Sequence, residues 1–146
     1  MNKDGGVAIG LDIGARRIGV ARGDFEVVIA TPLPAWPNDE TIFANISRIV
    51  KENQAEIVVI GLPRDANGQE TAQSQISRDF ASELSNYLNT RIHFQDESLT
   101  SVIAEKNLRS RKNFNENMLR DGMLDSEAAA IILQDFLNSN NNREGV

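Results

Sequence analysis

Three acidic residues stand at positions from which a folded chain could bring carboxylates together. Asp12 lies near the end of the apolar stretch "VAIGLDIG", Glu97 ends "RIHFQDE", and Asp125 precedes "SEAAAIILQDFL". Mg²⁺ prefers oxygen ligands, and two such ions about 4 Å apart can activate a water and stabilise the leaving oxygen of a phosphodiester. Because the chain has no cysteine and one histidine, thiolate zinc sites, cysteine nucleophiles and multi-histidine metal sites are excluded. The acidic residues therefore fit metal-assisted phosphoryl chemistry better than the chemistry of a catalytic triad.

Each of these acids also has a plain structural interpretation. Asp12, two residues before a glycine, could shape a turn, and Glu97 could be a solvated residue at the end of a strand. Asp125 could be the N-cap of the helix that follows it. The pattern of acids alone leaves a shared site and three separate structural roles open.

The composition suits one globular domain. The chain has 146 residues, of which 40% are hydrophobic and 25% charged. No apolar run approaches the ~20 residues that span a bilayer, and the start "MNKDGG" lacks the apolar core of a signal peptide. With no cysteine as well, we expect a cytoplasmic protein that makes no membrane contact. We expect residues 1–138 to form the domain and residues 139–146 to form a disordered polar tail.

The net charge of -6 argues against a general polyanion binder that is held by bulk charge. Basic residues nevertheless gather in the stretch "EKNLRSRKNFNENMLR" at 105–120. This cluster could bind phosphates, or it could be a solvated flexible loop. Its candidate phosphate ligands are Arg109, Arg111, Lys112 and Arg120.

The first half of the chain predicts three strands and a helix. Alternation and apolar runs predict strands at 7–13, 17–22 and 25–30, with a tight hairpin turn at Gly23-Asp24. The three prolines of "TPLPAWP" predict a loop. A helix should begin at Asn38 as its N-cap, because apolar residues follow at helical spacing. Those residues are Ile42, Phe43, Ile46, Ile49 and Val50.

The second half alternates strands and helices. The run "EIVVIGLP" predicts a buried parallel strand, "RDANGQE" a loop, and "RIHFQDE" a further strand. Three helices are expected here. One lies between these two strands, a second spans about 100–108, and a third runs from Asp125 to Leu137. The first of these three should bury Ile76, Phe80, Leu84, Tyr87 and Leu88. We therefore expect an α/β fold in which three antiparallel strands and then parallel strands form one mixed sheet flanked by helices.

Four stretches together resemble a known family. "GLDIGARRIGVARGD", "VVIGLPRDANGQE", "FQDESLTSVIAE" and "LDSEAAAIILQDFL" are similar, in order, to the motifs of the YqgF-type proteins. These proteins are described as Holliday-junction resolvases and as nucleases that mature the precursor of small-subunit ribosomal RNA. The resemblance runs from about Ala8 to Leu137 and implies a ribonuclease-H-like fold. It also implies catalytic and metal-binding roles for Asp12, Glu97 and Asp125, with Mg²⁺ or Mn²⁺ as the cofactor.

The resemblance extends to residues around these acids. It implies phosphate contacts for Arg16 and Arg17, and loop-shaping roles beside the site for Gly14, Gly61, Pro63 and Gly68. Two features depart from the family pattern. Ser98 stands where the family usually has arginine, and the nearest base before Asp125 is Arg120, with "DGML" between them. Both departures remove positive charge near the expected site.

The expected function is a Mg²⁺- or Mn²⁺-dependent nuclease that acts on structured RNA, with the 5′ end of pre-16S rRNA as its substrate. One alternative is a Holliday junction resolvase that acts on branched DNA. Another is an RNA- or ribosome-binding module with weak catalysis. An actin-like ATPase could also use "LDIG", but such proteins need two domains and 146 residues allow one. We expect a monomer or homodimer whose partner is nucleic acid.

Overall fold

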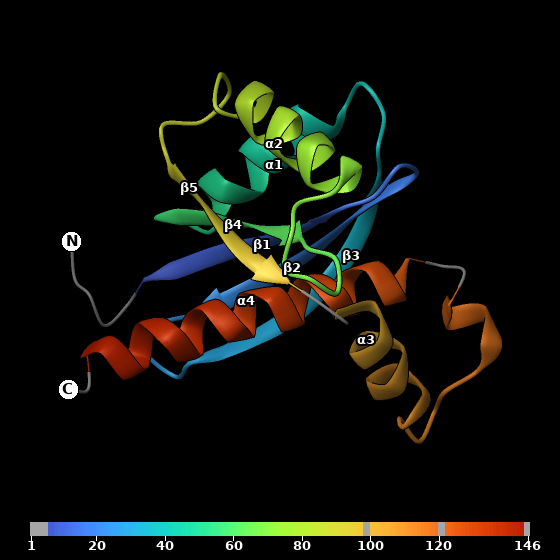
Figure 1. Cartoon of the computed structure of the whole chain (residues 1–146). Helices are drawn as coiled ribbons and strands as arrows, with labels where there is room; N and C mark the ends of the chain where they lie inside the picture. The colour runs from blue at the N-terminus through green and yellow to red at the C-terminus, as the bar shows by residue number, and fades with distance from the viewer. Residues whose placement is uncertain (1–5, 98–99, 120–121, 145–146) are drawn as a thin grey trace.

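The structure is built on one five-stranded mixed sheet in the order β3-β2-β1-β4-β5 (Figure 1). The strands are β1 (Val7–Ile13), β2 (Arg17–Asp24), β3 (Ile29–Pro37), β4 (Ile57–Pro63) and β5 (Arg91–Glu97). β2 runs antiparallel to β1 and to β3, whereas β4 runs parallel to β1 and to β5. The expected mixed sheet of antiparallel and then parallel strands is confirmed.

Helices cover both faces of this sheet. α1 (Ile42–Glu52) and α2 (Ala72–Leu84) lie on one face, and the long α4 (Met123–Glu144) crosses the other. α3 (Thr100–Arg109) packs beside α4 and is followed by a short 3-10 helix, η2 (Glu116–Leu119). The computed structural model describes residues 6–97, 100–119 and 122–144. No helix within these ranges is long and apolar enough to cross a membrane.

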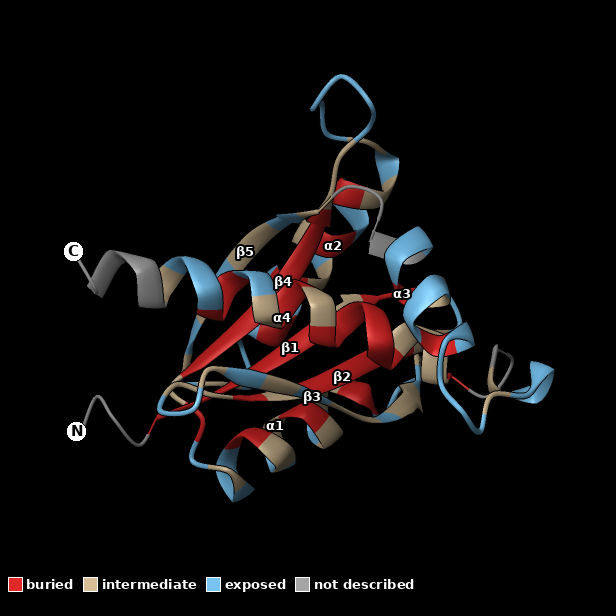
Figure 2. Ribbon diagram, turned by 90° about the horizontal axis from the view of Figure 1, so that it is seen from below, coloured by how far each residue is buried: buried red, intermediate tan, exposed pale blue. Residues whose placement is uncertain are grey.

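Strand alternation divides the core into two clusters. On one face Ile9 and Leu11 of β1 pack with Ile42 and Ile46 of α1 and with Leu84 of α2. On the other face β1 presents smaller residues to α4, which comes so close that a Cβ at Gly10 would lie 2.8 Å from the Leu133 Cβ. Buried residues accordingly fill the central strands and the inner side of α4 (Figure 2). On this face the backbone of α4 can therefore lie close to the backbone of the sheet.

The third strand differs from its prediction. The turn occupies residues 25–28 rather than Gly23-Asp24, and the stretch "TPLPAWP" belongs to β3 instead of forming a loop. The Asp24 carboxylate accepts the backbone N–H of Glu26 at 2.8 Å, and Val28 adopts a left-handed φ of 58°. β3 is an edge strand, so its prolines need not donate hydrogen bonds to a further neighbour. Proline content alone could not distinguish a loop from such an edge.

The start of α1 also differs from its prediction. The helix begins at Ile42 with Thr41 at the N-cap position, so Asn38 is not the N-cap. The Asp39 carboxylate instead accepts the Thr41 backbone N–H and hydroxyl, at 2.9 and 2.6 Å. This local turn competes with helix formation over residues 38–41.

The buried stripe expected on the second helix is partly wrong. Ile76 is 51% exposed and Tyr87 is 49% exposed. α2 turns small residues toward the sheet in their place: Ser74, Ser77 and Ala81, followed by Leu84. The Thr71 hydroxyl caps the helix and Ser74 donates to the Pro63 carbonyl, which fixes this rotation. Spacing of large apolar residues cannot reveal a helix face made of serines.

The last helix is longer at both ends than predicted. α4 begins at Met123, so Asp125 lies in its first turn and is not its N-cap. At the other end the helix continues from Leu137 through residue 144, over a stretch for which we expected a polar tail. Once a helix is anchored by buried residues such as Leu133 and Phe136, each further residue adds its hydrogen bond at little cost.

Candidate active site

Asp12 lies near the end of the central strand β1, on the α4 face of the sheet. Its neighbours Leu11 and Ile13 pack into the opposite core cluster, so strand alternation turns Asp12 toward α4. Directly across on β2 lies Gly19. On the other side, β4 places Gly61 beside Asp12, because Gly61 follows the residue that pairs with Leu11. Neither neighbouring strand therefore has a side chain beside the Asp12 carboxylate.

The two glycines let the other acids approach. A Cβ at Gly19 would lie 2.0 Å from the Asp125 carbonyl oxygen, so the first turn of α4 rests directly on β2. A Cβ at Gly61 would lie 2.9 Å from the Glu97 Oε1, so that carboxylate lies over β4. Gly61 and Pro63 lie inside β4 rather than in a loop, which corrects the expected loop-shaping role. The role that the geometry gives Gly61 is to leave room both for Ile132 of α4, whose Cδ1 would lie 2.5 Å from a Cβ there, and for Glu97.

The three acids interact electrostatically. Burial raises the pKa of Asp12 to about 7, and the negative charges of Glu97 and then Asp125 add to this rise. An aspartate in water has a pKa near 4, so the fold disfavours the ionised form of Asp12 when no cation is present. The structure thus brings together the charges of the three acids singled out in the sequence, with Asp12 as the one on which the other two act.

Arg17 forms an ion pair with Asp125, the acid that α4 carries in its first turn. Its Nε lies 3.2 Å from Oδ2 of Asp125, and both side chains are partly exposed. Among residues 6–97, 100–119 and 122–144, no three Asp, Glu or His side chains already stand in positions to coordinate one ion. The possible ligands are the carboxylate oxygens of Asp12, Glu97 and Asp125. Hard divalent cations prefer oxygen ligands of this kind.

The turn after Asp12 is held from two distant segments. Gln73 of α2 donates its Nε2 to the Ile13 carbonyl at 3.0 Å. Asn38 donates its Nδ2 to the next carbonyl, that of Gly14, at 2.8 Å. Sequence reasoning missed both contacts, because the local pattern favours Asn38 as a helix cap and nothing nearby distinguishes Gln73. These bonds fix the backbone immediately beyond the Asp12 carboxylate.

The same turn closes on itself. Gly14 donates its N–H to the Arg17 carbonyl at 3.1 Å, and a Cβ at Gly14 would lie 2.6 Å from that oxygen. Arg16 is exposed at the tip of the turn, and its carbonyl accepts the Asn38 N–H at 2.9 Å. The basic pair therefore separates: Arg17 points to Asp125, whereas Arg16 is exposed to solvent.

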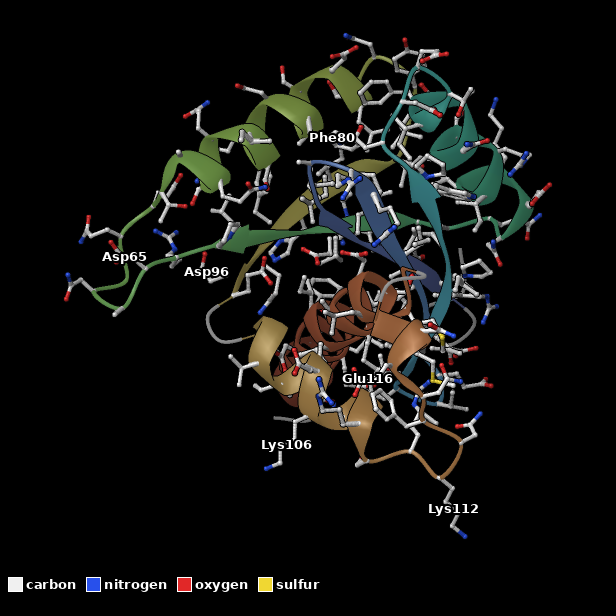
Figure 3. All side chains as sticks on the ribbon, turned by 90° about the vertical axis from the view of Figure 1, so that its right-hand side faces the viewer. Asp65, Phe80, Asp96, Lys106, Lys112 and Glu116 are labelled. Carbon is white, nitrogen blue, oxygen red and sulfur yellow. The ribbon has the colours of Figure 1, made fainter. Side chains whose placement is uncertain are left out.

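The end of β5 is fixed by the loop after β4. Arg64 donates its backbone N–H to the Glu97 carbonyl at 3.0 Å, and its guanidinium lies 3.0 Å from the Asp96 carboxylate. Figure 3 shows Asp65 and Asp96 at this same end of the sheet. Gly68 turns the loop with a left-handed φ of 78°, and a Cβ on it would meet nothing within 4 Å. These contacts hold the backbone from which the Glu97 carboxylate projects.

Two arginines of the basic cluster are bound to acids. Arg109 belongs to α3 rather than to a loop, and it pairs with Glu105 at 2.9 Å and Glu116 at 3.3 Å. Arg111 pairs with Glu127 of α4, whose side chain is 11% exposed. Both pairs tie the segment between α3 and α4 to the helices beside it.

The two lysines of this region are exposed. Lys106 and Lys112 point away from the ribbon into solvent (Figure 3). Arg120 and Ser98, which the sequence singles out, lie outside the described residues. The positions of the lysines leave their charges accessible to a polyanion.

Comparison with known proteins agrees with this geometry. The family profile described as "RuvX: Holliday junction resolvase" matches residues 6–139. A "Putative pre-16S rRNA nuclease" of Chloroflexus aggregans is 41% identical over 137 residues, which cover 92% of this chain and 94% of the relative. A relative with the same name from Sulfurihydrogenibium is 40% identical over 131 residues, or 88% of each chain.

Solved structures show the same fold at low sequence identity. RuvC of Thermus thermophilus bound to a Holliday junction has a TM-score of 0.57 and 12% identity, covering 94% of this chain and 96% of that one. The fowlpox virus Holliday junction resolvase has a TM-score of 0.54 and 14% identity, covering 91% and 99%. The expected ribonuclease-H-like fold is therefore confirmed.

Proposed function

Because this chain belongs to the RuvX family, we propose that it is a nuclease that depends on Mg²⁺ or Mn²⁺ and hydrolyses phosphodiester bonds in structured nucleic acid. Its proposed reaction is maturation of the 5′ end of pre-16S rRNA, as the names of its relatives suggest. The observation that carries the proposal is the raised pKa of Asp12 under the charges of Glu97 and Asp125. A site that concentrates carboxylates in this way is built to take up a cation.

In this proposal Asp12, Glu97 and Asp125 hold the metal. When bound, the metal supplies an activated water and stabilises the leaving oxygen of the phosphodiester. Asp12 is the rigid member, because it projects from a central strand that is paired on both sides. Arg17 orients Asp125 through its ion pair and holds that carboxylate at the start of α4.

The substrate contacts follow from which cations are exposed. Arg16 and Lys112 are exposed and can reach phosphates, with Lys106 on the same side as Lys112. Arg109 and Arg111 are bound in ion pairs, so we assign no phosphate contact to them. We place this reaction in the cytoplasm, in keeping with the absence of cysteine.

Branched DNA is the second candidate substrate, because the family profile is described as a Holliday junction resolvase. A cleavage assay that compares a pre-16S rRNA fragment with a four-way DNA junction separates the two candidates. Each substrate is incubated with Mg²⁺, with Mn²⁺ and with a chelator. Preferential cleavage of the RNA supports the rRNA reaction, and preferential cleavage of the junction supports the second candidate.

Variants test whether the acids carry the reaction. Asp12→Asn should abolish cleavage without unfolding the protein, and Asp79→Asn, at an exposed position on α2, should cleave normally. Full activity of Asp12→Asn would overturn the site assignment. Tight RNA binding by the unaltered protein without cleavage in either metal would overturn the nuclease proposal and favour a binding module.

A further inference from the structure

A cavity of about 350 Å³ lies between the edge strand β3 and the start of α4. Its β3 wall includes Pro32, Leu33 and Pro34, and its α4 wall includes Met123 and Glu127. Its volume is at the lower end of the range of small-molecule sites in proteins, about 300–1,000 Å³. The residues that line it do not include Asp12, Glu97 or Asp125.

The cavity adjoins the candidate active site. Gly122 lines the cavity, and a Cβ on it would lie 3.2 Å from the Cδ of Arg17. Arg17 in turn holds the Asp125 carboxylate at 3.2 Å. Met123 and Ser126, which flank Asp125 in the first turns of α4, also line the cavity. A nucleic acid with a phosphate at Asp125 therefore has a neighbouring nucleotide within reach of this cavity.

The chemistry of the walls suits a neutral, planar group. Proline rings, a leucine and a methionine supply apolar surface, and a base that leaves its stack can pack between apolar side chains. The polar wall is the ion pair between Arg111 and Glu127, whose charges compensate each other. A phosphate would find no net positive charge there, whereas a base could use both an acceptor and a donor along its edge.

We propose that this cavity receives one unpaired nucleobase of the substrate next to the scissile phosphate. The base packs against the prolines of β3 and Met123, and its polar edge meets Glu127 and Arg111. This inference rests on the proposed function, since it adds a base subsite to the same active site. It also predicts that substrates need an unstacked nucleotide at this point, which hairpin ends and strand junctions supply.

The test measures binding rather than cleavage. In an Asp12→Asn background with Mg²⁺, a fluorescently labelled single-stranded pre-16S leader RNA is compared with a series in which each nucleotide in turn is abasic. One abasic position should weaken binding about tenfold, because the apolar contact between that base and the cavity walls is lost. The double variant Arg111→Met/Glu127→Leu should weaken binding of the intact RNA and be insensitive to that position.

The matched control is Arg48→Met/Glu52→Leu, which removes an exposed ion pair of α1 and leaves the net charge unchanged in the same way. It should retain full sensitivity to the abasic position. Met123→Ala removes one apolar wall of the cavity without altering the ion pair, and it too should be insensitive to the abasic position. This second variant tests the proposal even if the double variant does not fold. The proposal is overturned if no single abasic position matters, or if both cavity variants remain sensitive to it. Absence of cleavage by the unaltered protein would refute the nuclease and leave this binding result intact.

Discussion

Replacing Asp12 with asparagine should make the metal-free protein more stable at alkaline pH. The reason is that the folded chain holds this carboxyl in a buried place beside two other carboxylates. Ionised Asp12 is therefore disfavoured in the folded state and unhindered in the unfolded chain. Asparagine has nearly the same shape and never ionises, so the substitution removes this cost.

The magnitude follows from the pKa of Asp12. Folding raises it from 3.8 to about 7, a difference of about 3 units, and each unit corresponds to about 1.36 kcal/mol. Between about pH 4 and pH 7 the unfolded chain has released this proton while the folded chain keeps it, so stability falls as pH rises. The full cost, about 4 kcal/mol, applies above pH 7 and shrinks to less than about 1 kcal/mol near pH 4.

Urea unfolding of both proteins in chelator, at several pH values from about 4 to 8, measures this difference directly. Taking the difference at each pH cancels the contributions of titrating groups that do not interact with Asp12, so it reports on Asp12 together with its coupled partners Glu97 and Asp125. Asp79→Asn is the control, and its effect should stay small across the range because that side chain is exposed. If Asp12→Asn is no more stable than the parent near pH 8, or if its advantage does not shrink on acidification, the electrostatic account of the site is wrong.

Three further predictions follow from the same site. Addition of Mg²⁺ or Mn²⁺ near pH 8 should raise the thermal midpoint of the parent protein and leave that of Asp12→Asn nearly unchanged, as differential scanning calorimetry can show. Gly19→Ala should lower the free energy of unfolding by about 1–3 kcal/mol, because its Cβ would lie 2.0 Å from the Asp125 carbonyl oxygen. A normal urea midpoint for this variant would contradict the close packing of α4 on β2. Gln73→Leu should lower kcat at least tenfold with little change in KM, because it frees the backbone after Asp12. Gln134→Leu removes a similar amide contact, to the Val28 carbonyl in the turn before β3, and equal kinetic effects of the two variants would argue against positioning by Gln73.

The central part of the fold could be predicted from sequence because its signals are local. The run "IVVIGLP" is apolar on both faces, as expected of a parallel strand covered by helices, and it forms β4. The errors occurred where tertiary contacts override local patterns. Three prolines are compatible with β3 only because that strand lies at an edge, and the rotation of α2 depends on Ser74 reaching the Pro63 carbonyl. Neither contact is encoded in a short window of sequence.

The candidate site was predictable to a different degree. Asp12, Glu97 and Asp125 could be singled out because each lies near the end of an element, and the fold brings their charges together. The ion pairs of Arg17 and Arg111 could not be anticipated, because their partners are distant in sequence. Arg17 of β2 reaches Asp125 of α4, and Arg111, which follows α3, reaches Glu127 of α4. The cluster that looked uniformly basic therefore separates into paired arginines and exposed lysines.

The glycines beside Asp12 explain why a carboxylate can stand on a sheet face that a helix covers. A side chain at Gly19 would push α4 off β2, and one at Gly61 would collide with Glu97. Because neither position carries a side chain, α4 can lie against the sheet while its first turn brings Asp125 toward Asp12. The same closeness that buries Asp12 therefore gathers the charges that raise its pKa. Since a divalent cation would relieve both effects at once, the row Gly19-Asp12-Gly61 joins the packing of the fold to the chemistry proposed for it.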